Sequence, residues 1–353
     1  MTSAFNAAEN LDGESLLDGW TVLNRVPDRP GATGGNFSIC YFVEHADGRR
    51  GFCKVLNIAA ALNSQDAIKA VQELTTAHNF ERDLHDMCGR DGLSRIVVSI
   101  GHGEFIRDGY AVGNVAYLIF EIADGDVRKV LDSNAGGSLF EKLDWLHDAA
   151  VGVQQLHSRG VAHQDLKPSN VLVFSSNDTG LSRSKVGDLG RATDPKHPMW
   201  HDEFAIAGDP TYAPPEQLYG ATPIDFGQRR FGCDLYQLGS LITFLVTGGT
   251  FNAWLVNELH PAHTPVNWTG SYAAVEPYVQ DAAGRVVARV EAAIPDPEIG
   301  QRIAGLVEGL CQPNPQLRGN IKDVAAGRQF DLARTVTELD LLSKRVRISA
   351  ARR

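Results

Sequence analysis

The feature that most constrains the fold is a single change in the spacing of apolar residues, near "ADGD" (123–126). Before this point most of the chain consists of short β-rich runs. They are "WTVLNRV" (20–26), two runs around Asp47-Gly48 within 37–57, "SRIVVSIGHGEF" (94–105) and "VAYLIFEIA" (115–123). An Asp-Gly pair between such runs is a hairpin signal. Residues 58–88 instead repeat apolar residues every three or four positions, which predicts a helix.

After residue 126 the pattern is mostly helical. The segment 139–160 is amphipathic and ends in glycine, a typical C-terminal signal. "LYQLGSLITFLVTGG" (235–249) is apolar on nearly all sides, as in a buried helix. Residues 301–311 and 331–345 predict two surface helices. The scattered Pro, His and Trp of 252–300 predict an irregular insertion with short helices.

These patterns predict an α+β protein with a strand-rich part followed by a helix-rich part. The expected divisions are an N-terminal segment (1–19), a strand-rich lobe (20–122), a helix-rich lobe (123–330), and a C-terminal helix with a basic tail (331–353). With 353 residues, 43% of them hydrophobic, the chain is long enough to bury two modest cores.

Composition excludes several classes of function. The net charge of −10 argues against nonspecific binding to nucleic acid or to an acidic membrane. The five cysteines are dispersed without a C-x-x-C pair, so a disulfide framework or a zinc site is not expected. The N-terminus is polar and acidic, unlike a signal peptide, and no run of about 18 apolar residues would span a membrane. A cytoplasmic protein is therefore expected.

The stretch "VAHQDLKPSN" (161–170) gathers chemically active side chains on a loop after the first long helix of the second part. Phosphoryl transfer needs a carboxylate that orients the attacking hydroxyl, a lysine that neutralises the moving phosphoryl group, and oxygen ligands for Mg²⁺. Asp165, Lys167 and Asn170 supply these groups. Asp188, in "GDLG" after the strand-like "SKV", offers a second carboxylate for the metal.

Taken in order, these segments resemble those of the eukaryotic-type (Hanks-type) Ser/Thr protein kinases. "HQDLKPSN" is similar to the catalytic loop H-R-D-L-K-P-x-N, and "DLG" to D-F-G. Three later segments, at 208–220, 234–248 and 312–318, resemble G-T-P-x-Y-x-A-P-E, D-x-x-x-L-G and D-P-x-x-R. The resemblance runs from about residue 20 to 320. It implies a two-lobed kinase fold, with a β-rich N-lobe and a helical C-lobe, in which Arg318 pairs with Glu216.

The resemblance also implies roles for the residues of the catalytic loop. Asp165 would orient the substrate hydroxyl, Lys167 would stabilise the γ-phosphate, and Asn170 and Asp188 would hold Mg²⁺. His163 and Asp234 would be scaffold: the histidine would pack beneath Leu189, and Asp234 would cap the backbone of the loop. The lysine two residues after the catalytic aspartate favours Ser/Thr over Tyr as acceptor.

In the N-lobe, "GATGGNFSICYFV" (31–43) fits a glycine-rich phosphate loop only loosely. Gly35 aligns with the second glycine and Phe37 with the aromatic residue at the tip, while Thr33 replaces the first glycine. A glycine-rich turn is by itself more often a simple hairpin. Lys54, in "GFCKVL", matches the lysine of V-A-I-K that holds the α- and β-phosphates.

The acidic partner of Lys54 should come from "FERDLHDM" (80–87). Glu81 is favoured because it continues the apolar face of this helix, and Asp83 is the alternative because it follows Phe80 by the family's usual spacing. Farther along, Phe120 falls at the gatekeeper position. Glu121 and Ala123 would then begin the hinge that meets adenine.

Several positions depart from the family pattern. Phe52 stands where alanine is usual, Leu189 replaces the phenylalanine of D-F-G, and Asp209 replaces the threonine of G-T-P. Gln164 takes the place of an arginine that, in many kinases, pairs with a phosphorylated activation segment. Since a neutral residue needs no anion, Gln164 argues against phosphate-dependent ordering of 188–216.

The function expected from these residues is Mg²⁺-dependent transfer of the ATP γ-phosphate to Ser/Thr of a protein substrate, or of the chain itself. A pseudokinase acting as an ATP-binding or scaffold module is the first alternative, favoured by the departures and opposed by the complete set of charged residues. A small-molecule kinase of the aminoglycoside type shares H-x-D-x-x-x-x-N. Against it stand the Lys-Pro after Asp165 and the segment "PTYAPPE".

Overall fold

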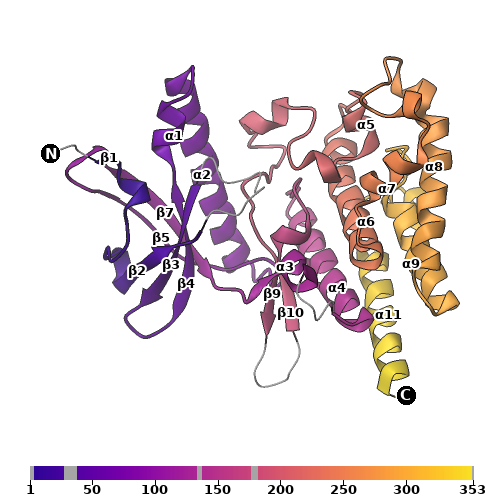
Figure 1. Cartoon of the computed structure of the whole chain (residues 1–353), viewed down its shortest axis with the longest axis horizontal. Helices are drawn as coiled ribbons and strands as arrows, with labels where there is room; N and C mark the ends of the chain where they lie inside the picture. Colours follow the sequence, from indigo (N-terminus) through magenta and orange to yellow (C-terminus); the bar gives the residue numbers. More distant parts are fainter. Residues whose placement is uncertain (1–3, 28–37, 133–136, 176–181, 352–353) are drawn as a thin grey trace. The chain divides into compact units, whose positions relative to one another are not determined.

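The computed structural model describes residues 4–27, 38–132, 137–175 and 182–351. The chain divides into two compact units, Met1–Ala123 (unit 1) and Asp124–Arg353 (unit 2). Strands dominate the first and helices the second, as the change in apolar spacing predicts (Figure 1). The α+β class is therefore confirmed.

Unit 1 is built on an antiparallel sheet, and within the described ranges its strands follow the order β2-β3-β4-β7-β5. Their bounds are Trp20–Arg25 (β2), Ser38–His45 (β3), Arg50–Leu56 (β4), Ser99–Ile106 (β5) and Asn114–Glu121 (β7). The predicted hairpin joins β3 to β4, and Gly48 adopts a positive φ of 87° in its turn. Glycine suits this position because a side chain would be strained there.

One face of this sheet is covered by the N-terminal segment. Tyr41, Val43, Cys53, Val55, Tyr117 and Ile119 form a buried core with Ala7, Ala8, Leu11 and Leu16. β1 (Ala4–Asn6) pairs in parallel with β6 (Tyr110–Val112). The Tyr41 hydroxyl donates to the Ala8 carbonyl at 2.7 Å, and the Leu17 N–H donates to the Tyr117 hydroxyl at 3.0 Å. Residues 4–19 are thus an integral part of unit 1.

The helical segment predicted at 58–88 consists of two helices, α1 (Ile58–Leu62) and α2 (Ala67–Arg90). The break falls before Asp66, whose side chain caps α2 by accepting from the Lys69 N–H at 3.1 Å. Leu56, Ala61 and Leu74 pack into a small cluster that holds both helices to the end of β4. The longer helix carries the acidic residues expected to face Lys54.

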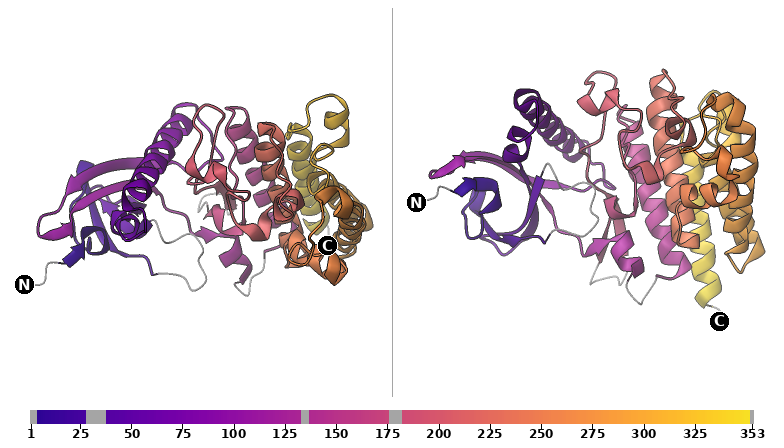
Figure 2. Two further views of the ribbon diagram at one scale, coloured as in Figure 1. Left: turned by 90° about the horizontal axis from the view of Figure 1, so that it is seen from above. Right: turned by 45° about the horizontal axis from the view of Figure 1, so that its top comes forward.

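Unit 2 is helical apart from a short sheet. Its strands are β8 (Gly125–Asp126), β9 (Val171–Ser175) and β10 (Ser182–Val186). The helices are α3 (Val127–Asp132), α4 (Leu139–His157), α5 (Pro215–Leu218), α6 (Gly232–Thr247), α7 (Phe251–Glu258), α8 (Tyr272–Ala292), α9 (Pro297–Leu310), α10 (Ile321–Ala325) and α11 (Ala333–Ala351). A Ser138–Glu141 capping box starts α4. α4 packs against α11, and α8 against α9 (Figures 1 and 2).

The expectation of an irregular insertion at 252–300 is wrong. This region forms α7 and the 21-residue helix α8. α8 buries Tyr272, Val275, Val279, Ala282, Ala283, Val286 and Val290, a helical spacing that the nearby Pro, His and Trp residues obscure in the sequence. Pro277 lies inside this helix, where it cannot donate the backbone hydrogen bond that another residue would give to the Ala273 carbonyl.

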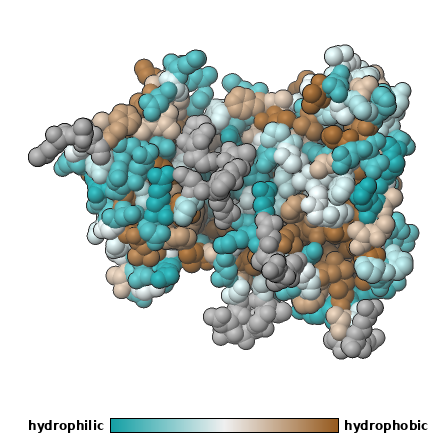
Figure 3. Space-filling view, in the orientation of Figure 1, coloured by the Kyte–Doolittle hydropathy of each residue, from teal (hydrophilic) through white to brown (hydrophobic). Residues whose placement is uncertain are grey.

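α6 is the most deeply buried helix of unit 2 and packs against α4, α7, α8 and α9. Among the described residues, no single helix has the length and apolar character needed to cross a bilayer. Only the bent pair Gly227–Thr247 and Phe251–Glu258 meets both criteria, and only when taken together. The face drawn in Figure 3 shows hydrophilic and hydrophobic residues interspersed on both units.

The basic C-terminal segment forms the end of α11. Arg345 pairs with Glu298, Arg347 with Asp144, and Lys344 with Asp340 at 2.6 Å. These partners lie on α9, α4 and α11 itself. Within the described part of this segment, the charges of Lys344, Arg345 and Arg347 are therefore matched inside unit 2.

Candidate active site

In unit 1, the central strand β4 presents Lys54 to helix α2. The Lys54 ammonium donates to both carboxylate oxygens of Glu81, at 2.8 and 2.9 Å. Glu81 is buried, whereas the alternative, Asp83, is exposed and pairs with its neighbour Arg82 at 2.8 Å. The structure thus pairs Lys54 with Glu81. A bidentate contact of this kind fixes the lysine ammonium at one point next to the sheet.

The same face of the sheet carries the expected gatekeeper. Phe120 lies directly opposite Phe52 in the β4–β7 register, and Phe52 packs edge-on against Phe42. The replacement of alanine by Phe52 therefore puts an aromatic ring beside the gatekeeper. Glu121 accepts from the Val98 N–H through its side chain at 2.7 Å, and Ala123 is the last residue of unit 1. The backbone groups of these two residues are therefore candidates for the contact with adenine.

In unit 2, α6 holds the backbone of the catalytic loop. Asp234, fully buried, accepts from the N–H groups of His163 (2.8 Å) and Gln164 (2.7 Å). One turn later, Gln237 accepts from the Leu166 N–H at 2.8 Å and donates to the Gln164 carbonyl at 2.7 Å. Capping by Asp234 follows the expectation from sequence. The role of Gln237 was missed, although a polar amide inside an otherwise apolar helix is a readable signal.

His163 links the loop to the D-L-G segment. Its Nδ1 accepts from the Asp165 N–H at 3.1 Å, so Nε2 carries the proton and donates to the Gly187 carbonyl at 3.1 Å. Both His163 and Leu189 are fully buried. The imidazole ring therefore bridges the backbone of Asp165 and that of Gly187, the residue before Asp188.

Asp165 is nine-tenths buried and oriented from several sides. Its Oδ1 accepts from the Asp209 N–H at 2.8 Å, and its Oδ2 accepts from the Asn170 amide at 3.2 Å. The Lys167 ammonium lies 2.9 Å from Oδ2. Desolvation raises the pKa of Asp165, and the positive charge of Lys167 opposes that rise. The result is a fixed carboxylate suited to receiving a hydroxyl proton.

The activation segment approaches this carboxylate very closely at Gly208. A Cβ at this position would lie 2.2 Å from the Gln164 carbonyl and 2.8 Å from Asp165 Oδ1, so only glycine fits. Asp209 follows, and its carboxylate lies 3.7 Å from the Lys167 ammonium. Lys167 is thus placed between two carboxylates, with Asp165 the nearer.

The expected metal ligands Asn170 and Asp188 are tied together through the backbone. The Gly187 N–H donates to the Asn170 carbonyl at 2.9 Å. The Asn170 amide nitrogen donates to the Asp165 carbonyl at 2.8 Å, so its Oδ1 is the side-chain atom that could hold a metal ion. Asp188 is exposed, with a positive φ of 57°. One amide oxygen and one carboxylate fit Mg²⁺, which takes one or two carboxylates together with phosphate oxygens and water.

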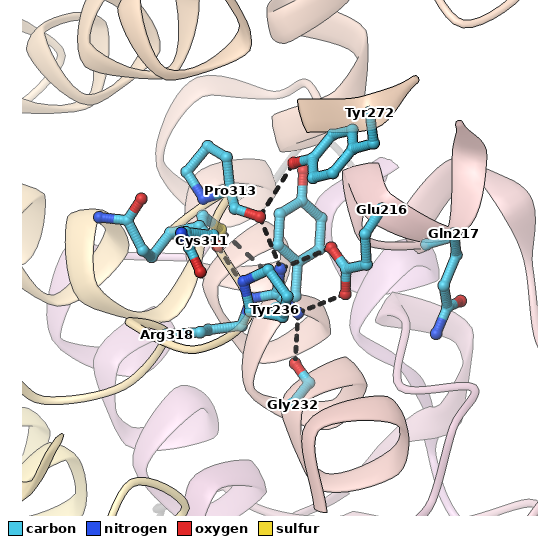
Figure 4. A network of polar contacts seen from close by, with 12 residues as sticks. Glu216, Gln217, Gly232, Tyr236, Tyr272, Cys311, Pro313 and Arg318 are labelled. Carbon is cyan, nitrogen blue, oxygen red and sulfur yellow. Dashed lines mark hydrogen bonds and ion pairs between the residues drawn. The ribbon is translucent and has the colours of Figure 1, made fainter. Parts of the chain in front are cut away.

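A buried ion pair anchors the end of the activation segment to the rest of unit 2. Arg318 donates to both oxygens of Glu216, at 2.8 and 2.7 Å, and also to the Gly232 carbonyl at 3.2 Å (Figure 4). The Tyr272 hydroxyl and Arg318 both donate to the Pro313 carbonyl. The predicted pairing of Glu216 with Arg318 is confirmed. Because both charges are buried, losing one partner would leave the other uncompensated.

Two expected nucleotide contacts, Gly35 and Phe37, lie outside the described residues, as does Thr33. Of the remaining expected site residues, Lys54, Glu81, Glu121 and Ala123 belong to unit 1. Asp165, Lys167, Asn170 and Asp188 belong to unit 2. Within unit 2 the structure brings the carboxylates, the lysine and the amide into one cluster.

Comparison with known proteins supports this arrangement. The protein kinase domain family matches residues 34–328, which is most of the chain. The chain is 23% identical over 224 residues to serine/threonine-protein kinase GL21140 of Drosophila persimilis (60% of this chain, 26% of the relative). It is 33% identical over 101 residues to serine/threonine-protein kinase DCLK1 of Rattus norvegicus (28% of this chain, 22% of the relative). It is 27% identical over 211 residues to serine/threonine-protein kinase PknA of Mycobacterium tuberculosis (59% of this chain, 43% of the relative).

In each comparison the chain matches less than half of the relative's own length. The family match itself covers the segment from the glycine-rich stretch to just beyond Arg318. It includes the catalytic loop, the D-L-G segment and the Glu216–Arg318 pair, in the order the family has them. The chain therefore belongs to the protein kinase domain family, with a β-rich N-lobe and a helical C-lobe.

Proposed function

We propose that this protein is a Mg²⁺- and ATP-dependent kinase that phosphorylates Ser or Thr of a protein substrate. The observation that carries the proposal is the environment of Asp165. Its carboxylate is oriented by the Asp209 N–H and the Asn170 amide and is paired with Lys167 at 2.9 Å. This arrangement positions a proton acceptor and a phosphoryl-neutralising cation next to each other.

Within unit 2, the residues of the site have distinct roles. Asp165 orients the substrate hydroxyl and accepts its proton at a carboxylate oxygen, while Lys167 neutralises charge on the γ-phosphoryl group. Asn170 Oδ1 and the Asp188 carboxylate hold Mg²⁺. When bound, the metal offsets the negative charge of the phosphates. Asp209 steadies both Asp165, through its N–H, and Lys167, through its carboxylate.

Unit 1 supplies the residues that bind the nucleotide. Lys54, fixed by Glu81, contacts the α- and β-phosphates. Gly35 and Phe37 occupy positions of the family's glycine-rich phosphate motif, and the backbones of Glu121 and Ala123 contact adenine. These assignments follow from the positions that the residues occupy in the family's motifs.

The preference for Ser/Thr rests on Lys167, two residues after Asp165, and on relatives named as serine/threonine-protein kinases. A catalytically silent scaffold is less well supported, because Lys54, Glu81, Asp165 and Asp188 all retain their charged groups. A small-molecule kinase is disfavoured by the Gly208–Glu216 segment, which closes over the catalytic loop and ends in the buried pair with Arg318.

The proposal is tested by incubating the purified protein with γ-labelled ATP, Mg²⁺ and a generic protein substrate. Label should appear on phosphoserine or phosphothreonine after acid hydrolysis, and chelation of Mg²⁺ should abolish it. Asp188→Asn should raise the Mg²⁺ concentration needed for half-maximal rate, because a carboxylate ligand is lost. Binding of Mg-ATP by calorimetry without any transfer would favour the scaffold. Transfer to an aminoglycoside but to no protein would favour the small-molecule kinase.

A further inference from the structure

A cluster of polar side chains in unit 2 joins the catalytic loop to the activation segment. Its three members are Gln164 of the loop, Asp202 of the short helix η4 (Trp200–Glu203), and Arg230 of the π-helical turn η6 (Gly227–Phe231). Gln164 and Arg230 are 1% and 3% exposed. We call these three residues the Arg230 cluster. None of them is among the groups to which the catalytic step is assigned above.

Gln164 connects the loop to the activation segment at Arg191 and to the turn before α6 at Arg230. It has a positive φ of 64°, a strained conformation that the bonds from Asp234 and Gln237 hold in place. Its amide nitrogen donates to the Arg191 carbonyl at 2.9 Å, just after the D-L-G residues. Its amide oxygen accepts from the guanidinium of Arg230. The neutral side chain therefore serves as both donor and acceptor.

Arg230 carries the positive charge of the cluster. Its Nη2 lies 2.9 Å from Asp202 Oδ1 and also donates to the Asp202 carbonyl at 2.9 Å. A buried guanidinium is strongly destabilising without an anion, so Arg230 requires the carboxylate of Asp202 to stay where it is. The neighbouring Arg229 also donates to the Asp202 carbonyl, at 2.6 Å.

Asp202 gathers donors from separate parts of the chain. Its Oδ2 accepts from the Thr193 hydroxyl at 2.7 Å and from the Met199 N–H at 2.8 Å. Thr193 in turn forms two backbone hydrogen bonds with Ala162, at 2.9 and 3.0 Å, immediately before the catalytic loop. One carboxylate thus ties the middle of the activation segment to the start of the loop.

We propose that Arg230 and Asp202 are positioning residues for phosphoryl transfer, with the carboxylate of Asp202 acting as a permanent, genetically encoded anion that orders the activation segment. The matching cation is the Arg230 guanidinium, in the turn before α6. It contacts the catalytic loop by donating to the side chain of Gln164. This inference rests on the proposed kinase function and deepens it by stating how the site is regulated. Its consequence is activity that does not depend on phosphorylation of residues 188–216.

The first experiment measures kcat and the KM for ATP in Asp202→Asn, Arg230→Gln and the double variant. Asp202→Asn keeps the shape of the side chain but leaves Arg230 without its anion. We expect kcat to fall at least tenfold while the KM for ATP stays within about twofold. The double variant, which replaces the ion pair by two neutral amides, should be at least threefold more active than Asp202→Asn. Arg302→Gln, which breaks the ion pair between Arg302 on α9 and Glu338 on α11, is the control and should leave both constants unchanged.

A second measurement does not depend on activity. Hydrogen exchange of 188–216 in the full-length protein should be at least tenfold faster in Asp202→Asn than in wild type, with the rest of unit 2 unchanged. If Asp202→Asn does not fold, Thr193→Val is used instead, because it removes one hydrogen bond to the same carboxylate and keeps the ion pair. A wild type without any phosphoryl transfer would contradict the kinase proposal, while the exchange data would still decide the role of the cluster.

Phosphatase treatment of the wild type, verified by mass spectrometry, should leave kcat unchanged within about twofold. A tenfold loss after removal of a phosphate from 188–216 would overturn the inference. The inference would also be overturned if Asp202→Asn and Arg230→Gln both kept the wild-type kcat and the wild-type rate of hydrogen exchange in 188–216.

Discussion

Asp209 stands where the family has a threonine, and its contact with the catalytic aspartate is made by the backbone. Its N–H donates to Asp165 Oδ1 at 2.8 Å, and its side chain accepts from the Thr211 N–H at 2.9 Å. The carboxylate is 3.7 Å from the Lys167 ammonium, farther than the 2.9 Å between Lys167 and Asp165. Because this contact is made by the backbone, it does not depend on whether the side chain is threonine or aspartate. The site can therefore accommodate Asp209 in place of the family's threonine.

His201 gives a prediction about pH that concerns stability rather than catalysis. Burial lowers its pKa to about 4, with Asp202 opposing this shift and Arg191 and Arg230 adding to it. The unfolded chain has an ordinary histidine pKa of about 6.5. Between these values the unfolded state binds a proton that the folded state does not. The free energy of unfolding should therefore fall as pH drops from about 6.5 to 4, by up to ~1.4 kcal/mol per pH unit.

The measurement is urea unfolding of the wild type and His201→Gln at several pH values in that range. As pH decreases, the free energy of unfolding of the variant should fall less steeply than that of the wild type, whatever its absolute stability. His260→Gln, which removes an exposed histidine, is the matched control and should keep the wild-type slope. Identical slopes for His201→Gln and the wild type would show that the buried imidazole does not contribute.

At the scale of helices, the packing of α6 against α9 depends on a glycine. A Cβ on Gly239 would lie 2.5 Å from the Cys311 sulfur and 2.9 Å from the Leu310 Cβ. Gly239→Ala should lower the free energy of unfolding by about 1–3 kcal/mol, because the two helices must separate. Gly305→Ala in α9, where no atom lies within 4 Å of the added Cβ, should instead stabilise by about 0.5–1 kcal/mol. Thermal and urea unfolding should show that the free energy of unfolding falls in Gly239→Ala and rises in Gly305→Ala. Destabilisation of equal size in both variants would contradict the packing argument.

Elements with clear local signals were predictable from the sequence, including the β3–β4 hairpin and α4. α8 was missed because Pro277 and the His- and Trp-containing stretch before it suggest an irregular segment. The helical repeat of its buried residues becomes visible only over the whole helix, from Tyr272 to Val290. The N-terminal segment was expected only as a separate piece. Its small residues Ala7 and Ala8 carry no strong pattern, and their burial depends on a sheet formed far along the chain.

At the scale of the whole molecule, the candidate site residues could be named from the sequence where a short motif contains them, and their roles stay predictions. Asp165, Lys167, Asn170 and Asp188 lie within two such motifs. The choice between Glu81 and Asp83 required the structure, because both lie on α2 and only burial separates them. The Arg230 cluster was not predictable, since its two contacts join Arg230 to residues 66 and 28 positions away, and no sequence spacing reveals them.

The central claim is that Asp165 serves phosphoryl transfer from Mg-ATP to a protein. The most direct measurement compares wild type and Asp165→Asn in the initial rate of γ-phosphate transfer to a protein Ser/Thr, with ATP binding measured in parallel. Asn keeps the size of the side chain but cannot accept the hydroxyl proton. The account predicts at least a hundredfold lower rate in the variant, on the order expected for losing a catalytic base, with ATP still bound. Equal rates in the two proteins, or no transfer by a wild type that binds Mg-ATP, would contradict it.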